Sequence, residues 1–231
     1  MFTKSAAFYD AVYAFKDYIW EVERITQIID ENCPRASTLL DVACGTGMHL
    51  AGLKKRFRCD GLDLDPNLLA IAKARNPECQ FHLADMLNFK LDKKFDVITC
   101  LFSSIGYARD VDALNAAIKS MKEHLAEGGL LIVEPWLAPE VFIDGHLGSL
   151  FVDKDDFKLA RIHLSHRQGK HSILNFHYLV GTPTGVEHAI EEHVTTLFTN
   201  DEYFEAFSKA GLAAERDAEG LMGRGLFLGR A

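Results

Sequence analysis

Between Thr38 and Glu134, short apolar runs alternate with segments of helical periodicity. We expect strands over residues 39–43, 59–62, 81–84, 95–102 and 130–134, and helices from about Gly47, from Asp65 and over residues 110–125. Strands that alternate with helices form parallel sheets joined by right-handed crossovers. The pattern therefore predicts a doubly wound, Rossmann-like α/β core.

Two boundaries of these helices have local signals. Asp65 is an N-cap residue, and Pro66 follows it at the first helical position. The helix that starts near Asp110 is followed by Glu127-Gly128-Gly129, and glycine accepts the left-handed conformation in which many helices end. We therefore predict that this helix extends to the Gly128 region.

The ends of the chain follow other patterns. Apolar residues recur at steps of three and four over residues 5–31, with one interruption near Ala14, which predicts a helical N-terminal segment. After Trp136, Ala160, Ile162 and Leu164 alternate with polar residues, and a second alternating run covers residues 174–180. A turn at 168–169 separates these two runs, and a second turn at 181–185 leads into a third run over 186–198. The three runs and their turns together predict an antiparallel meander with one apolar face. A helix over 201–210, ended by Gly211, and a strand over 225–229 are expected to complete the core.

We interpret the chain as one domain with an insertion. Its expected parts are a helical N-terminal segment (1–36), a nucleotide-type binding core (37–137), the antiparallel insertion over the substrate side (150–199) and a last helix and strand (200–231). The meander is too small to have a core of its own.

Composition excludes several classes of protein. The 25 Lys and Arg residues against 33 Asp and Glu residues give a net charge of −8, and no basic run is present, so a nucleic-acid partner is not expected. The five cysteines lack the spacing of a disulfide framework or a zinc site, so we expect no metal. No stretch approaches the roughly 18 apolar residues of a membrane span, and no apolar leader follows Met1. We expect a cytoplasmic protein that does not enter a membrane.

A glycine turn between the first strand and its helix is the main functional signal. Ala43, Cys44, Gly45 and Gly47 form this turn, where a ligand can approach the backbone closely. A dinucleotide fingerprint would need glycine at position 50, which is leucine here. Asp41, just before the turn, would repel a pyrophosphate and attract a ligand that carries an ammonium and a sulfonium. The charge favours S-adenosylmethionine.

Further polar and apolar residues stand at the ends of the next strands. Carboxyl ends of parallel strands meet at one edge of the sheet, where open α/β sheets bind ligands. An acidic residue after the second strand suits ribose hydroxyls, and a carboxylate beside methionine suits adenine. The predicted cofactor contacts at these ends are Asp63, Leu64, Asp85, Met86, Leu101 and Phe102.

The chain resembles class I S-adenosylmethionine-dependent methyltransferases in residues 39–50. Phe-Ser-Ser-Ile-Gly (102–106), Val-Glu-Pro-Trp (133–136) and Gly-Arg-Gly-Leu-Phe (223–227) resemble, more restrictively, the sugar N,N-dimethyltransferases that build dimethylamino sugars of macrolides. This resemblance implies a seven-stranded sheet, a homodimer and a substrate in which a nucleotide carries a deoxyamino sugar. S-Adenosylhomocysteine would be the product of the cofactor. Relatives have an additional tyrosine about eight residues before the pair that matches Tyr9-Asp10, a place that falls here at Met1 or Phe2, so the exact sugar stays open.

The resemblance also suggests roles for single residues. Relatives have tyrosine or histidine at Tyr107, which we expect to orient the amine, while Tyr18 is expected near the methionine end of the cofactor. Arg224 is expected to bind a diphosphate, and Trp136 to form a wall against the sugar or base. An uncharged amine is already a nucleophile, so the reaction demands alignment rather than a dedicated base.

Three other functions remain open at this point. An N- or O-methyltransferase of another small metabolite would be favoured if Arg224 were held in a structural pair. A binding module without catalysis would leave Tyr107 without a role. A dehydrogenase is opposed by Asp41 and Leu50.

Overall fold

A computed structural model describes residues 8–231 of the chain, so the part of the expected N-terminal helix before residue 8, and positions 1 and 2, lie outside the described residues. The helices are α1 (Tyr9–Val12), α2 (Tyr18–Asn32), α3 (Met48–Leu53), α4 (Pro66–Arg75), a 3₁₀ helix (Ser104–Tyr107), α5 (Val111–Glu123) and α6 (Asn200–Lys209). The strands are β1 (Thr38–Val42), β2 (Arg58–Asp63), β3 (Gln80–Leu83), β4 (Phe95–Cys100), β5 (Leu125–Val133), β6 (Leu147–Asp153), β7 (Lys158–Gln168), β8 (His171–Thr182), β9 (Gly185–Thr196), β10 (Ala213–Asp217) and β11 (Leu226–Arg230). None of the helices described is long and apolar enough to span a membrane.

Seven strands form the main sheet, in the order β10-β11-β5-β4-β1-β2-β3. The first five strands in the sequence pair in parallel, whereas β11 runs antiparallel to both β5 and β10. The predicted α/β sheet is therefore confirmed, although β10 was not predicted. Since β1 lies between β2 and β4, the chain reverses its direction of progress at β1, and the crevice of a doubly wound sheet opens there.

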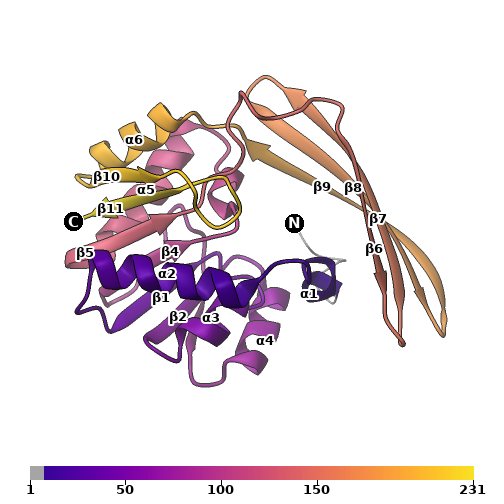
Figure 1. Ribbon diagram of the computed structural model, residues 1–231, viewed down its shortest axis with the longest axis horizontal. Helices are drawn as coiled ribbons and strands as arrows, with labels where there is room; N and C mark the ends of the chain where they lie inside the picture. The colour runs from indigo at the N-terminus through magenta and orange to yellow at the C-terminus, as the bar shows by residue number, and fades with distance from the viewer. Residues whose placement is uncertain (1–7) are drawn as a thin grey trace.

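The central strands are apolar on both faces because helices cover both sides of the sheet (Figure 1). Leu39 packs with α2 and α3, and its neighbour Leu40 packs with α5 and α6 on the opposite face. In β5, Leu130 packs on the same face as Leu39, and Leu131 packs on the same face as Leu40. This burial on both faces accounts for the continuous apolar runs in the sequence.

Local signals place several helix ends as predicted. Asp65 caps α4 through its carboxylate, which accepts a hydrogen bond from the Asn67 backbone N–H at 2.8 Å. Gly211 has a φ of +77° just after α6. The interruption predicted near Ala14 is confirmed, since α1 ends at Val12 and α2 begins at Tyr18.

The prediction for the end of α5 was wrong. The helix stops at Glu123, and the next residue, His124, bonds to β4 and to the segment before it. Its carbonyl accepts a hydrogen bond from Phe95 N–H at 2.8 Å, and its Nε2 accepts one from Leu91 N–H at 2.9 Å. Gly128, with a φ of +70°, lies within β5, next to a shift in the pairing of β4 with β5. The left-handed glycine therefore accommodates an irregular strand rather than a helix end.

A separate four-stranded antiparallel sheet, in the order β6-β7-β8-β9, contains the predicted meander. It projects from the α/β body, and α1 lies between the two sheets (Figure 1). Its inner face shares a cluster with α1, in which Tyr13 packs with Leu159, Phe176 and Tyr178.

The expectation of a single apolar face was wrong for β7. Ile162 and Leu164 are 47% and 37% exposed on the outer face, whereas Arg161 and Ser165 are buried on the inner one. The inner face of β7 is polar because it borders a cavity.

Candidate active site

The glycine turn leaves β1 at the crevice and enters α3. Ala43, Gly45 and Gly47 have φ values of +59°, +56° and +72°, so the backbone reverses tightly after the strand. A Cβ at Gly47 would lie 2.6 Å from Asn76 Nδ2 and 3.2 Å from Ala72 Cβ. Gly47 therefore packs closely against α4 and the residue that follows it, and its role as a cofactor contact stays a prediction.

An edge cavity of about 220 Å³ opens at the ends of β1, β2 and β3. Its predicted members are Ala43, Gly45, Asp63, Leu64, Asp85, Met86 and Tyr107. Asp65 also lines it, and Arg109 is the one cationic residue among the lining residues that the structure describes. The cavity is therefore predominantly acidic, and Asp85 and Met86 lie in it together as expected.

A smaller inner cavity of about 30 Å³ continues toward α2 and α3. The predicted residues that line it are Tyr18, Asp41, Ala43, Cys44, Gly45, Leu101 and Phe102. Burial raises the pKa of the Cys44 thiol well above its usual value, which suits a packing residue rather than a nucleophile.

Two carboxylates give these cavities their charge. Asp41 is buried and accepts a hydrogen bond from the Thr99 hydroxyl at 2.8 Å, and burial raises its pKa to about 6. Asp63 accepts backbone hydrogen bonds from Gly45 at 2.8 Å and Asp65 at 2.9 Å, and burial raises its pKa as well. A cationic ligand would stabilise both ionised groups, so Asp41 fits the charge of S-adenosylmethionine, while Asp63 can also accept hydrogen bonds from its ribose. The same charges disfavour a dinucleotide.

The end of β4 forms a turn in the left-handed region. The strand stops at Cys100 rather than Phe102, because Phe102 and Ser103 have φ values of +51° and +61°. Glu134 fixes this turn by accepting the Phe102 N–H at 2.6 Å, and the Ser103 hydroxyl donates to the Pro135 carbonyl at 2.7 Å. The restrictive motifs around residues 102–106 and 133–136 thus meet in one turn.

Helix α1 is fastened over the glycine turn by polar contacts that the sequence did not predict. The Thr46 hydroxyl donates to Asp10 at 2.6 Å, and Arg75 forms an ion pair with the same carboxylate. This arrangement places Tyr9 of α1 against both the edge cavity and the inner cavity.

A buried cluster attaches the start of α2 to α3. Lys16 Nζ lies 2.8 Å from Glu21 Oε1, and His49 Nε2 lies 2.7 Å from Glu21 Oε2. The Lys16 ammonium is also 3.9 Å from the centroid of the Phe102 ring. The cluster thus ties the wall of the inner cavity to the turn after β4.

A sheet-side cavity of about 220 Å³ lies between the main body and the inner face of the four-stranded sheet. Phe102, Tyr107, Trp136 and Arg224 were predicted site residues and line it. Tyr9, Ser104 and Tyr107 also line the edge cavity, so the two cavities meet at these residues. A group held in one cavity can reach a group held in the other there.

Arg224 is positioned by neutral groups. Its Nη1 donates to the Ser103 hydroxyl at 2.8 Å, and its guanidinium carbon is 4.8 Å from the Trp136 ring centroid. Trp136 Nε1 donates in turn to Ser172 at 2.9 Å. Arg224 forms no ion pair with any carboxylate in residues 8–231, so its charge remains available to an anion.

Tyr107 is held by a residue from the second sheet. Its phenol oxygen is 2.6 Å from His193 Nδ1, and burial raises the pKa of the phenol. His193 is 2% exposed, and its Nε2 lies 3.7 Å from Glu191 Oε2. The predicted orienting residue therefore has a fixed support.

Sequence reasoning missed Tyr9, Ser104 and Arg161 as lining residues. Tyr9 belongs to the Tyr-Asp pair of the family resemblance, which was a usable signal. Ser104 lies within a quoted motif, whereas Arg161 had no signal beyond its place in an alternating strand.

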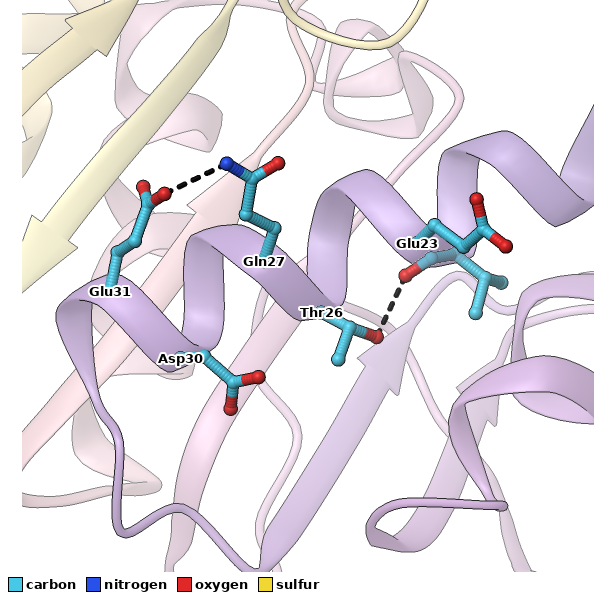
Figure 2. Close-up of a pocket in the computed structure, with 6 residues that line it drawn as sticks. Glu23, Thr26, Gln27, Asp30 and Glu31 are labelled. Atoms are coloured by element: carbon cyan, nitrogen blue, oxygen red, sulfur yellow. Dashed lines mark hydrogen bonds between the residues drawn. The ribbon is translucent and has the colours of Figure 1, made fainter.

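A surface hollow of about 540 Å³ lies along α2 (Figure 2). Its polar side chains come from one helix and bond along it, as Gln27 does to Glu31 at 2.8 Å. Nothing there resembles a binding site. The described residues also contain no cluster of three or more potential metal ligands.

Comparison with known proteins agrees with this geometry. Residues 39–129 match the family described as methyltransferase domain. The chain is 40% identical to dTDP-3-amino-3,6-dideoxy-alpha-D-glucopyranose N,N-dimethyltransferase of Streptomyces fradiae, over 97% of this chain and 89% of that protein. It is 42% identical to dTDP-3-amino-3,4,6-trideoxy-alpha-D-glucopyranose N,N-dimethyltransferase of Streptomyces venezuelae, over 93% and 91% of the two chains.

A solved structure shows the same fold with cofactor bound. The S-adenosylmethionine complex of CalS10, an amino pentose methyltransferase from Micromonospora echinaspora, superposes with a TM-score of 0.89. It is 38% identical and covers 96% of each chain. The acidic crevice, the turn after β4 and these relatives lead to one conclusion: the chain belongs to the family of S-adenosylmethionine-dependent amino-sugar N-methyltransferases.

Proposed function

We propose that this enzyme transfers one or two methyl groups from S-adenosylmethionine to the amino group of a nucleotide-linked deoxyamino sugar. The observation that carries the proposal is the meeting of two cavities of opposite charge at Tyr9, Ser104 and Tyr107. The acidic edge cavity suits a cationic cofactor, and the sheet-side cavity, with its arginines, suits a diphosphate. The acceptors named for the relatives are sugars of this kind.

The enzyme's contribution to the reaction is alignment. The cofactor supplies a methyl group on a sulfonium, which an amine can displace in line. Tyr107, supported by His193, would hold the amine by a hydrogen bond at the junction of the cavities. Tyr18 would lie at the methionine end of the cofactor, and Trp136 would bound the sugar or base. An amine with an ordinary pKa near 8 is partly neutral at cellular pH, so its proton can leave to water.

The availability of Arg224 favours this acceptor over another small metabolite. An arginine held in a structural pair would have indicated the alternative, but the Arg224 guanidinium donates only to a hydroxyl among its described hydrogen-bond partners. We treat the chain as one catalytic unit whose four-stranded sheet covers the substrate side. The five cysteines are unpaired, which suits a reducing compartment, and we place the enzyme in the cytoplasm.

Mass spectrometry of a reaction with S-adenosylmethionine and a thymidine-diphosphate 3-amino-3,6-dideoxyhexose tests the function. We expect a gain of one or two methyl masses on the sugar, with one S-adenosylhomocysteine per methyl group. No gain with intact cofactor binding would move the acceptor to the small-metabolite class.

The outer face of the four-stranded sheet supports a homodimer. Large apolar side chains are exposed there on all four strands, including Phe151 (72%), Leu179 (50%) and Ile190 (51%). Cross-strand pairing places Phe151 opposite Ala160, and Ala160 opposite Leu179, so the patch is continuous. Such a patch on a sheet marks an interface. We assign it to a second copy of the chain.

Analytical ultracentrifugation checks the dimer. The unaltered protein should sediment with twice the 25.8 kDa mass of the chain, and the double variant Phe151→Glu/Ile190→Glu as a folded monomer, because four charges would be buried in the interface. Ile143→Glu, at an exposed position outside the sheet, is the matched control. A dimer that survives the double variant would place the interface elsewhere.

A further inference from the structure

Arg161 is a buried cation with unsatisfied hydrogen-bond donors. It lies on β7 and lines the sheet-side cavity, and it is only 9% exposed. Its guanidinium donates a hydrogen bond to the Tyr13 hydroxyl, but its Nε and Nη1 atoms are buried without a hydrogen-bond partner, and it forms no ion pair with any residue that the structure describes. Burying an unpaired charge is costly, so such a group in a cavity wall indicates a ligand of opposite charge.

Aromatic rings fix the plane of this guanidinium. Its central carbon is 4.7 Å from the centroid of the Phe176 ring and 5.5 Å from that of Tyr13. Stacking of this kind occupies the faces of the guanidinium and leaves the unsatisfied Nε and Nη1 donors in its plane available. A planar fork of donors matches the oxygens of a phosphate.

His163 adds a second unsatisfied group on the same face of β7. Its Nδ1 is buried without a hydrogen-bond partner, and the ring also lines the cavity. Burial, with the neighbouring Arg161 charge, lowers the pKa of His163, so the ring is neutral and can donate one hydrogen bond. Gly148 provides the space, since a Cβ there would lie 2.1 Å from His163 Cε1.

Arg224 contributes the other guanidinium of the cavity. It comes from the loop between β10 and β11 and is fixed by Ser103 and Trp136, whereas Arg161 comes from the four-stranded sheet. Among residues 8–231, no carboxylate lines this cavity. Two fixed guanidinium groups on different elements provide more positive charge than a single phosphate monoanion would neutralise.

We propose that Arg161, assisted by His163, binds one phosphate of a nucleoside diphosphate while Arg224 binds the other, so that the enzyme selects diphosphate-linked over monophosphate-linked acceptors. This inference rests on the proposed function. It assigns Arg161 to substrate recognition and leaves methyl transfer itself to the residues at the junction of the cavities.

Isothermal titration of the protein saturated with S-adenosylhomocysteine tests the assignment, with TDP and TMP as probes. Arg161→Met should lower the affinity for TDP at least about 10-fold, as expected for the loss of a charge-assisted contact. Arg161→Met and Arg224→Met should also change the ratio of TDP to TMP affinity differently. The variant that loses the contact to the phosphate absent from TMP would bind both nucleotides almost equally, and the other would bind both more weakly.

Controls separate recognition from folding. A residue that only supported the fold would lower the melting temperature when replaced, whereas Arg161→Met should keep or raise it and leave the affinity for S-adenosylhomocysteine unchanged. Arg161→Lys retains the charge without the fork and should give an intermediate loss, and Arg58→Met, at an exposed position, should give none.

The outcomes are distinguishable. Unchanged TDP affinity in Arg161→Met, or the same change of ratio in both variants, would overturn the inference and leave the proposed function intact. Failure of the unaltered protein to bind either nucleotide while it binds S-adenosylhomocysteine would overturn both.

Discussion

Asp63→Ala is expected to weaken S-adenosylmethionine binding by at least about 100-fold. The carboxylate lines the edge cavity, where it can accept hydrogen bonds from ribose hydroxyls, and each bond to a charged group contributes about 1.5–3 kcal/mol. It also accepts the backbone N–H groups of Gly45 and Asp65, so its removal loosens the glycine turn. Isothermal titration with S-adenosylmethionine measures the effect.

Two further variants define the cause of this loss. Asp63→Asn keeps the shape of the side chain but has one accepting oxygen, so it should bind the cofactor more weakly than the unaltered protein and more tightly than Asp63→Ala. Asp92→Ala removes an exposed carboxylate outside the cavities and should change the affinity less than twofold. A folded Asp63→Ala protein with cofactor affinity within threefold of normal would show that Asp63 does not hold the ribose.

The cofactor half of the site was predictable because it depends on one topological rule. Once 39–134 is interpreted as alternating strands and helices, the ends of β1, β2 and β4 must meet at one edge, and Asp41 and Asp63 are carried there. Glycine in such a turn serves either a ligand or the packing of the turn, so the cofactor contact expected at Gly47 stays a prediction. The nearness of Asn76, which follows α4, explains why a side chain has no room at position 47.

The substrate half was less predictable because two sheets form it. Alternation in β7 shows that Arg161 and Ile162 point to opposite faces, but it does not say which face meets the body of the protein. In the structure the inner face of β7 is polar because it borders the sheet-side cavity, and its apolar side chains lie on the outer face. The contact between Tyr107 and His193 joins residues 86 positions apart and leaves no local signal.

Helix α5 shows a related limit. Gly128 has the conformation expected of a helix terminus, but the helix ends before it because His124 bonds to the neighbouring segment before β4. A tertiary contact thus overrides a local signal.

Cofactor affinity should depend on pH through Asp41. Burial raises the pKa of this carboxyl to about 6, with the Thr99 hydrogen bond and the nearby His49 charge acting in the opposite direction. A bound cation favours the ionised form, so lowering the pH from 7 to 5 should weaken S-adenosylmethionine binding about tenfold through Asp41. Titration calorimetry across this range measures it. The Asp41→Asn protein should bind S-adenosylmethionine weakly at both pH values. The part of the pH dependence that comes from Asp41 should be lost, while the part that comes from Asp63 remains.

The stability of the cofactor-free protein should change in the opposite direction. Because the pKa of Asp41 is higher in the folded state than the ordinary 3.8, the folded protein binds the proton more tightly than the unfolded chain does. This contribution to the free energy of unfolding is fully present below about pH 4 and is lost as the pH rises through 6, an effect of about 2–3 kcal/mol. Other carboxylates titrate in both proteins, so the difference in melting temperature between the unaltered protein and Asp41→Asn isolates it. That difference should widen in favour of Asp41→Asn between pH 4 and pH 7. A constant difference would mean that Asp41 is ionised throughout, and the pH dependence of cofactor binding would then have to come from Asp63.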